Sequence, residues 1–354
     1  MRLPVEPPVT PMLAKAVPTI PEGPYWYEPK WDGFRAIVFR DGDDIVIGSR
    51  NERPLTRYFP ELVKAFAANL PLRCVLDGEI VIVSDPGDRL DFEALQQRIH
   101  PAQSRIERLA GETPASFVAF DLLSDGDTDL SRTPFEERRS ALEAALVAAS
   151  APVHVTPGTL DVATARDWFD TFEGAGLDGI VAKRLDGVYQ QNKRVMAKIK
   201  HDRTADCVVA GYRTHKTGDD KVGSLLLGLY EGDELVSVGV IGAFPAATRV
   251  ELFKRLQPLV TTFEGHPWAY ARQEEGKRTP RNAEGSRWSG GKDLSFTPLE
   301  PSLVVEVAYD HMEGVRFRHN PRFRRWRPDR DAASCTFDQL ERPIRYDLSS
   351  ILDT

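Results

Sequence analysis

The chain has 354 residues and a formal net charge of −7; 41% of its residues are hydrophobic and 28% are charged. At about 150 residues per domain this length predicts two domains, and the lack of any run of about 20 apolar residues argues against a membrane-spanning helix. Prolines interrupt the first twenty residues, which argues against a secretory signal, and the widely spaced Cys74, Cys207 and Cys335 indicate no zinc site or disulfide framework, as in a reducing cytoplasm.

Strand and helix patterns are mixed in the residues up to Lys200. Two β-type runs, 34–40 and 45–48, are joined by an Asp-Gly turn at 41–44, and further β-type runs cover 74–83 and 116–123. Helices are predicted at 59–69, 134–149 and 163–174. Thr133 is the expected N-cap of the second helix, with Pro134 at its first position.

The pattern changes after Lys200. Short β-type runs at 205–212, 224–230, 235–241 and 303–309 are separated by Gly/Asp turns, with one helical insert at 250–258. This pattern is typical of a small β-barrel. We therefore predict an α+β protein with one domain at residues 1–201 and a second at 202–354.

Positive charge is concentrated in the C-terminal part. Net charge is a poor guide to nucleic-acid binding, because a binding face needs only local charge. Residues 316–330 are rich in arginine and contain a single acid, Asp329. Residues 276–292 are rich in Gly, Ser and Arg and are expected to form an exposed loop, whose candidate DNA contacts are Arg278, Arg281 and Arg287. A merely solvated charged surface is the alternative interpretation of this loop.

A series of short charged motifs runs through the chain. The first, Lys30-Trp31-Asp32-Gly33, would alone occur by chance in on the order of one chain in ten of this length. The motifs that follow it are Arg35, Ser49-Arg50-Asn51, Asp77-Gly78-Glu79, Phe120-Asp121, residues 178–183, Lys198-Ile199-Lys200 and residues 325–330. A charged pair inside a β-type run should not be buried without a function, and lysines two apart share one face of a strand.

In this order, the motifs resemble those of the covalent nucleotidyltransferase superfamily, which comprises ATP-dependent DNA ligases, RNA ligases and mRNA capping enzymes. The resemblance runs from about residue 11 to residue 330. The segment from Glu28 to Arg35 is similar to the bacterial DNA ligases of end joining and repair, and the overall size resembles the stand-alone actinobacterial ligase C group. The resemblance implies an ATP-grasp-like adenylation (nucleotidyltransferase) domain followed by an OB-fold β-barrel domain.

The resemblance also implies a three-step reaction. Lys30 would take AMP from ATP, AMP would move to the 5′-phosphate of a nick, and the neighbouring 3′-OH would displace it. A lysine is protonated at neutral pH and must lose its proton to attack, and the positive charges of Lys198 and Lys200 favour the neutral amine. The leaving pyrophosphate would be oriented by Arg325, Arg327 and Arg330.

Metal and nucleotide contacts are implied in the same way. Asp32, Glu79 and Asp178 would lie at sites for Mg²⁺ or Mn²⁺, which prefer oxygen ligands. Phe120 would stack on adenine, and Arg35 and Arg50 would contact the ribose or phosphates, including the 5′-phosphate of the nick. Glu28 and Lys183 complete the implied nucleotide contacts.

Two residues depart from the family pattern. Asp178 stands where glutamate is usual, which shortens the reach of the carboxylate, and Arg330 stands where lysine is usual, which replaces a point charge by a planar fork. Three other functions stay open, an RNA ligase, a capping guanylyltransferase and an inactive scaffold that binds DNA ends; the intact Lys30 argues against the scaffold. We expect a monomer in the cytoplasm, associated with the nucleoid, that acts on nicked duplex DNA and works with a repair polymerase or primase-polymerase.

Overall fold

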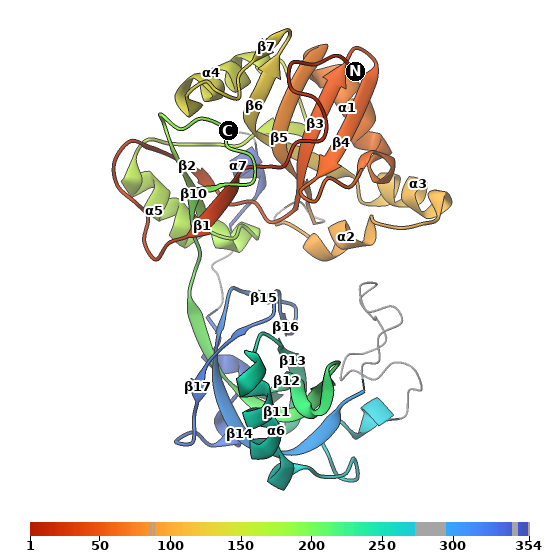
Figure 1. Ribbon diagram of the computed structural model, residues 1–354, viewed down its shortest axis with the longest axis vertical. Coiled ribbons are helices and arrows are strands. Elements are labelled where there is room, and N and C mark those ends of the chain that lie inside the picture. The colour runs from red at the N-terminus through yellow and green to blue at the C-terminus, as the bar shows by residue number, and fades with distance from the viewer. Residues whose placement is uncertain (85–86, 88, 273–294, 342–345, 353–354) are drawn as a thin grey trace. The chain divides into compact units, whose positions relative to one another are not determined.

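The computed structural model describes residues 1–84, 87, 89–272, 295–341 and 346–352. The chain divides into two compact units, one made of Met1–Lys200 together with Pro343–Thr354 and the other of His201–Arg342 (Figure 1). The prediction that all residues after 201 form the second domain is wrong for the described residues 346–352, which belong to the first unit. Among the described residues, no helix is long and apolar enough to cross a membrane.

The first unit contains two β-sheets. The larger has the strand order β4-β3-β5-β6-β7, with β8 paired in parallel to β6. The smaller has the order β1-β10-β9-β2, in which β1 and β10 are parallel and the other pairs antiparallel. The strands are β1 (Leu13–Ala16), β2 (Tyr25–Pro29), β3 (Phe34–Asp41), β4 (Asp44–Ser49), β5 (Arg73–Ile82), β6 (Ala115–Asp125), β7 (Thr128–Asp129), β8 (Val153–Val155), β9 (Ile180–Arg184) and β10 (Arg194–Ile199).

The helices of this unit differ in part from those expected. They are α1 (Pro60–Asn69), α2 (Phe92–Gln97), α3 (Gln103–Glu112), α4 (Phe135–Ala145), α5 (Val162–Thr171) and α7 (Ser349–Leu352). The expected cap at Thr133 is wrong, because Pro134 is the N-cap residue of α4 and no side chain caps this helix. The helix expected at 163–174 ends at Thr171 and continues as a short 3₁₀ turn, and α2 and α3 were not predicted.

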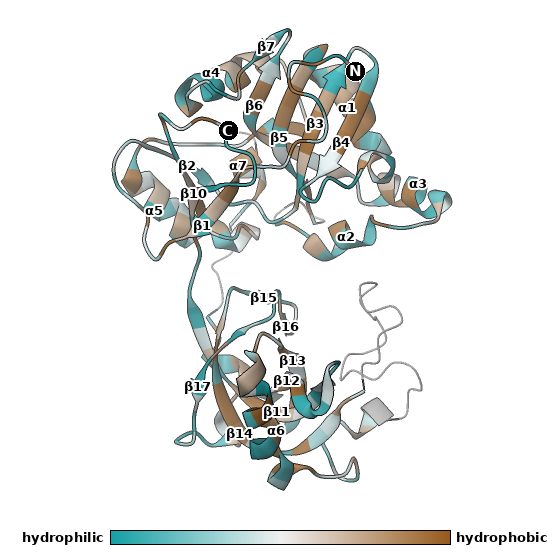
Figure 2. Cartoon of the chain, viewed as in Figure 1, coloured by the Kyte–Doolittle hydropathy of each residue, from teal (hydrophilic) through white to brown (hydrophobic). Residues whose placement is uncertain are grey.

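The larger sheet is buried on both faces. Alternate residues of a strand point to opposite faces, so Ala36 and Val38 pack with α1 and α4, while Ile37 and Phe39 pack against the N-terminal segment that contains Leu3. Figure 2 shows apolar residues concentrated along β3, β5 and β6. These central strands form a rigid base from which the polar residues of the site project.

The second unit is an OB-fold. Its main sheet has the order β13-β12-β11-β14-β17, with antiparallel neighbours and register shifts that allow the long strands to bend. Its elements are β11 (Arg203–His215), β12 (Gly218–Glu231), β13 (Glu234–Ile241), α6 (Ala246–Leu256), β14 (Thr297–Tyr309), β15 (Met312–Glu313), β16 (Arg316–Phe317) and β17 (Arg322–Trp326). Each β-type run expected in this region lies within one of the strands.

Candidate active site

Three strand ends place the central residues of the site together. Pro29, the last residue of β2, pairs with Ile180 of β9, and Ile180 pairs with Ile199, the last residue of β10. The residues just beyond these strand ends therefore meet at one edge of the smaller sheet: Lys30 follows β2, Asp178 precedes β9 and Lys200 follows β10. Backbone hydrogen bonds fix this arrangement, since the Lys30 amide donates to Gly179 O at 2.8 Å and the Asp178 amide donates to Lys30 O at 2.9 Å.

One carboxylate joins the two lysines. Asp178 Oδ2 lies 2.7 Å from Lys30 Nζ and 2.6 Å from Lys200 Nζ. The Asp178 side chain is only 5% exposed, and although this burial acts to raise its pKa, the Lys30 and Lys200 charges lower it below its ordinary value. Asp178 is therefore an ionised acid that pairs with both lysines.

Two glycines allow the chain to approach closely here. A Cβ atom at Gly33 would overlap the carbonyl oxygen of Ile80 in β5. Gly179 has a φ of +115°, and a Cβ atom there would overlap the carbonyl oxygen of Ile199. The glycine of the Lys30 motif therefore has a packing reason, because it brings the turn after β2 against the larger sheet.

Glu79 lies in β5 opposite Arg35 of β3. Burial raises its pKa to about 7; the charges of Arg35 and Lys30 lower it, and those of Asp32 and Asp77 raise it. Lys30 and Asp32 thus lie near enough to Glu79 to act on its pKa. In the described part of the chain, no three His, Cys, Asp or Glu side chains gather into a group that could hold a metal ion.

Glu28 and Lys183 form a buried pair on neighbouring strands β2 and β9. Lys183 Nζ lies 2.7 Å from Glu28 Oε2 and donates a hydrogen bond of 2.9 Å to Phe120 O. Burial raises the pKa of Glu28 and lowers that of Lys183, against the attraction between them. The other oxygen, Glu28 Oε1, is buried without a hydrogen-bond partner among the described residues, and Arg139 Nη1 lies 3.8 Å from it.

Arg35 is held by Asp77, a residue for which no separate role was predicted. Its Nε and Nη2 donate to the two oxygens of Asp77 at 2.5 and 2.6 Å, and the hydroxyl of Tyr189 donates to the same carboxylate at 2.6 Å. The Arg35 guanidinium lies 4.4 Å from the centre of the Phe120 ring, and Lys183 Nζ lies 4.7 Å from it. These contacts give Phe120, which is 8% exposed, a packing role alongside any contact with adenine.

Two further cations, Lys198 and Arg50, lie near Lys30 and Lys200. Lys198, in β10, pairs with Val181 of β9, and burial together with the charges of Lys30, Lys200 and Arg50 lowers its pKa, while Asp178 opposes this. Arg50 is exposed and directly follows β4. The first unit therefore gathers Lys30, Lys198, Lys200 and Arg50, the cations expected to meet a nucleotide.

The arginines of residues 316–330 have acidic partners from distant parts of the chain. Three ion pairs are Arg325–Glu306 at 2.7 Å, Arg327–Asp206 at 2.9 Å and Arg324–Asp202 at 2.6 Å. Sequence reasoning missed these acids because they lie on or next to other strands of the second unit. The candidate DNA contacts Arg278, Arg281 and Arg287 lie outside the described residues.

The fold and the site define a nucleotidyltransferase that carries an OB-fold. Comparisons with known proteins agree with this class. A family model described as ATP dependent DNA ligase domain matches residues 11–200, and one described as ATP dependent DNA ligase C terminal region matches residues 218–330. The chain belongs to the ATP-dependent DNA ligase family, and its reaction is the ATP-dependent formation of phosphodiester bonds.

Close relatives cover the full length of the chain. DNA ligase C of Mycobacterium tuberculosis is 63% identical over 357 residues, which span 99% of this chain and 99% of the relative. DNA ligase C2 of Mycolicibacterium smegmatis is 62% identical, with 97% of each chain covered. A solved structure from work on Lig E DNA ligases shares the fold, with a TM-score of 0.56, 18% identity and coverage of 89% of this chain and 99% of that one.

Proposed function

We propose that Lys30 is the residue of this ligase that carries AMP. The observation that supports this most directly is the position of its Nζ, which is 2.7 Å from Asp178 and partly exposed at the edge where β2 and β10 end and β9 begins. A nucleophilic lysine needs access to its substrate and neighbours that control its proton, and both are present here. An amine buried in a structural ion pair, as Lys183 is, would have no such access.

In the reaction that we propose, the Lys30 amine attacks the α-phosphorus of ATP, forming a P–N bond as the bond to pyrophosphate breaks. AMP then passes to the 5′-phosphate of a nick, and attack by the 3′-OH forms the phosphodiester bond and releases AMP. Before the first attack Lys30 must lose a proton, which leaves Asp178 paired with Lys200 alone. Lys198 and Lys200 then offset the negative charge that grows on the phosphate oxygens.

We also propose a role for Glu28 in the choice of base. Its Oε1 is a buried acceptor without a hydrogen-bond partner among the described residues, and such atoms are costly unless a ligand satisfies them. The exocyclic amino group of adenine could donate to this oxygen, whereas guanine carries an acceptor at the same position. Lys183 and Arg139 hold the carboxylate in place. This arrangement would favour ATP over GTP.

A divalent metal ion, Mg²⁺ or Mn²⁺, is proposed beside Glu79 and Asp32, with Asp178 as a further contact. Mg²⁺ is usually held by one or two carboxylates together with substrate phosphates, which suits a site where no larger acidic cluster occurs among the described residues. The raised pKa of Glu79 indicates a carboxylate whose ionised form would be stabilised by a nearby positive charge. When bound, the ion would neutralise charge on the phosphates.

The remaining cations are proposed to bind phosphates. Arg50 and, through the Nη1 that Asp77 leaves available, Arg35 would contact the nucleotide or the 5′-phosphate of the nick. Arg325, Arg327 and Arg330 would act on the leaving pyrophosphate. DNA ligases act on nicked DNA, and we propose a monomeric enzyme of DNA repair at the bacterial nucleoid that cooperates with a repair polymerase or primase-polymerase.

The test is incubation with α-labelled ATP or GTP and Mg²⁺, followed by a denaturing gel and a chase with nicked DNA. The unaltered protein should retain label from ATP, lose it to nicked DNA and join the strands, whereas Lys30→Ala should retain none. Lys64→Ala, which alters an exposed lysine of α1, is the matched control and should behave as the unaltered protein. Label on Lys30→Ala would overturn the assignment of the nucleophile.

A further inference from the structure

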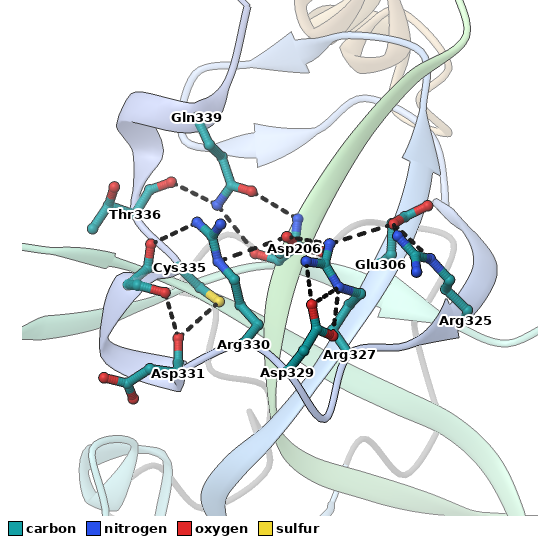
Figure 3. A network of polar contacts seen from close by, with 11 residues as sticks. Asp206, Glu306, Arg325, Arg327, Asp329, Arg330, Asp331, Cys335, Thr336 and Gln339 are labelled. Carbon is teal, nitrogen blue, oxygen red and sulfur yellow. Dashed lines mark hydrogen bonds and ion pairs between the residues drawn. The ribbon is translucent and has the colours of Figure 1, made fainter.

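Asp206 occupies a central place among the arginines of the second unit, although no sequence motif pointed to it. It lies in β11, opposite Glu306 of β14, and is 7% exposed. Figure 3 shows its carboxylate between Arg327 and Arg330, two of the residues assigned to pyrophosphate. A buried carboxylate costs free energy unless it is paired, so its partners indicate what it does.

Arg327 is fixed by hydrogen bonds to two acids, and its Nη1 also lies 3.5 Å from Oε2 of a third, Glu306. Its Nε and Nη2 donate to Asp329 at 2.9 and 2.8 Å, and its Nη1 donates to the two oxygens of Asp206 at 3.1 and 2.9 Å. The Arg327 amide also donates to Val304 O at 2.9 Å. A guanidinium held along two edges has one orientation, and this restraint comes in part from Asp206.

Arg330 uses the same carboxylate. Its Nε lies 3.7 Å from Asp206 Oδ2 and is buried without a hydrogen-bond partner among the described residues, while its Nη2 donates to Ser334 O at 3.2 Å. Two guanidinium groups near each other repel, and a carboxylate between them offsets that repulsion. Asp206 thereby sets the spacing of the two cations as well as the orientation of Arg327.

The backbone of Asp206 is itself held. The side chain of Gln339 accepts a hydrogen bond from the Asp206 amide at 2.7 Å and donates one to the Asp206 carbonyl oxygen at 3.1 Å. Gln339 also donates to Thr336 O at 2.8 Å. The carboxylate therefore stands on a fixed support, as expected of a group that positions others.

We propose that Asp206 is a positioning residue that holds Arg327 and Arg330 in the geometry needed for the pyrophosphate-releasing step, the formation of lysyl-AMP. The inference rests on the role proposed above for these arginines. Joining a nick whose 5′-phosphate already carries AMP releases no pyrophosphate. That step should therefore be insensitive to the loss of the Asp206 charge.

The test compares two reactions in Asp206→Asn, a change that keeps the shape of the side chain. Lysyl-AMP formation is followed at increasing ATP concentration, and joining is followed on pre-adenylated nicked DNA without ATP. A misplaced group can cost on the order of 100-fold, so we expect lysyl-AMP formation to slow by about that factor. Joining of the pre-adenylated nick should change by less than about 3-fold, and Asp206→Glu should recover part of the lost rate.

Control variants separate the possible causes. Asp202→Asn removes an exposed carboxylate that pairs with Arg324, and both of its rates should equal those of the unaltered protein. Arg327→Ala should slow lysyl-AMP formation, and adding Asp206→Asn to it should slow the step by less than Asp206→Asn does alone, because only the effect on Arg330 is then left to lose.

Equal loss of both reactions in Asp206→Asn, or a normal rate of lysyl-AMP formation, would overturn the inference about Asp206. A normal rate in Arg327→Ala would instead refute the role proposed for the arginines. A faster rate in Asp206→Asn would show that the carboxylate restrains the arginines, and this too would overturn the inference.

Discussion

Residues 346–352, the C-terminal segment that belongs to the first unit, allow a quantitative prediction for Leu348→Ala. Leu348 is 0% exposed and Ile351 is 2% exposed, and both pack in a cluster with Trp31 and Phe172. The substitution removes roughly three methylene equivalents, worth about 0.8 kcal/mol each. With a residual cavity, the total cost is about 3 kcal/mol.

This cost can be measured by calorimetry. For a unit of this size each kcal/mol shifts the melting temperature by about 2–4 °C, so Leu348→Ala should lower that of the first unit by about 6–12 °C. Trp31, a member of this cluster, follows Lys30 directly and donates to Thr156 Oγ1 at 2.8 Å. Lysyl-AMP formation should therefore slow as well, and amide hydrogen exchange should rise in α7 and at Trp31.

Val147→Ala is the matched control, because Val147 is 85% exposed and its truncation removes apolar atoms that pack against little. Its melting temperature should change by less than about 2 °C. An equally small change in Leu348→Ala would refute the reasoning, since it would mean that the segment contributes no packing free energy to the first unit.

Three further predictions follow from other parts of the molecule. Gly33→Ala should destabilise the first unit by about 1–3 kcal/mol and impair AMP attachment, because the new Cβ overlaps Ile80 O; thermal unfolding and labelling measure both effects. Burial raises the pKa of Glu79 from 4.5 to about 7, so the folded state binds its proton more tightly than the unfolded state. Metal-free protein should therefore lose stability as pH rises from about 4.5 to about 7, and Glu79→Gln should lose less; parallel melting curves of the two proteins would contradict this. Alanine in place of the three loop arginines should weaken binding to nicked DNA and reduce the salt slope by up to about 2.7, at about 0.9 per phosphate contact, and unchanged binding would indicate a merely solvated loop. The loop arginines are Arg278, Arg281 and Arg287.

The sequence predicted the strands better than the helix ends. β-branched and apolar runs bounded by Gly and Asp located β3, β4, β5 and β6; β3, β5 and β6 are buried on both faces, and their composition reflects it. The cap of α4 was wrong, since Pro134 occupies the N-cap position and the helix begins one residue later. α2 is only six residues long and shows too short a pattern to predict, although Asp91 caps it with its side chain.

The residues of the site were predicted from the sequence more successfully than the contacts between them. The motif order selected Lys30, Asp178 and Lys200, which the ends of three strands do bring together. The strong pairing of Arg35 with Asp77 was not predicted, because it depends on the register between β3 and β5. Acids such as Asp206 and Glu306 form ion pairs with the C-terminal arginines. These ion pairs also depend on strand pairing, which the local sequence does not reveal.

The chain leaves the first unit at Lys200 and is part of it again at residues 346–352, so the OB-fold is inserted into the nucleotidyltransferase unit rather than appended to it. Two covalent connections therefore join the units. A protease cut just after Lys200 would separate residues 1–200 covalently from the rest of the chain, and the OB-fold would then stay with the first unit only through the packing of the buried Leu348 and Ile351. A cut after the OB-fold would instead free only the short C-terminal segment, since the OB-fold would still follow Lys200 covalently.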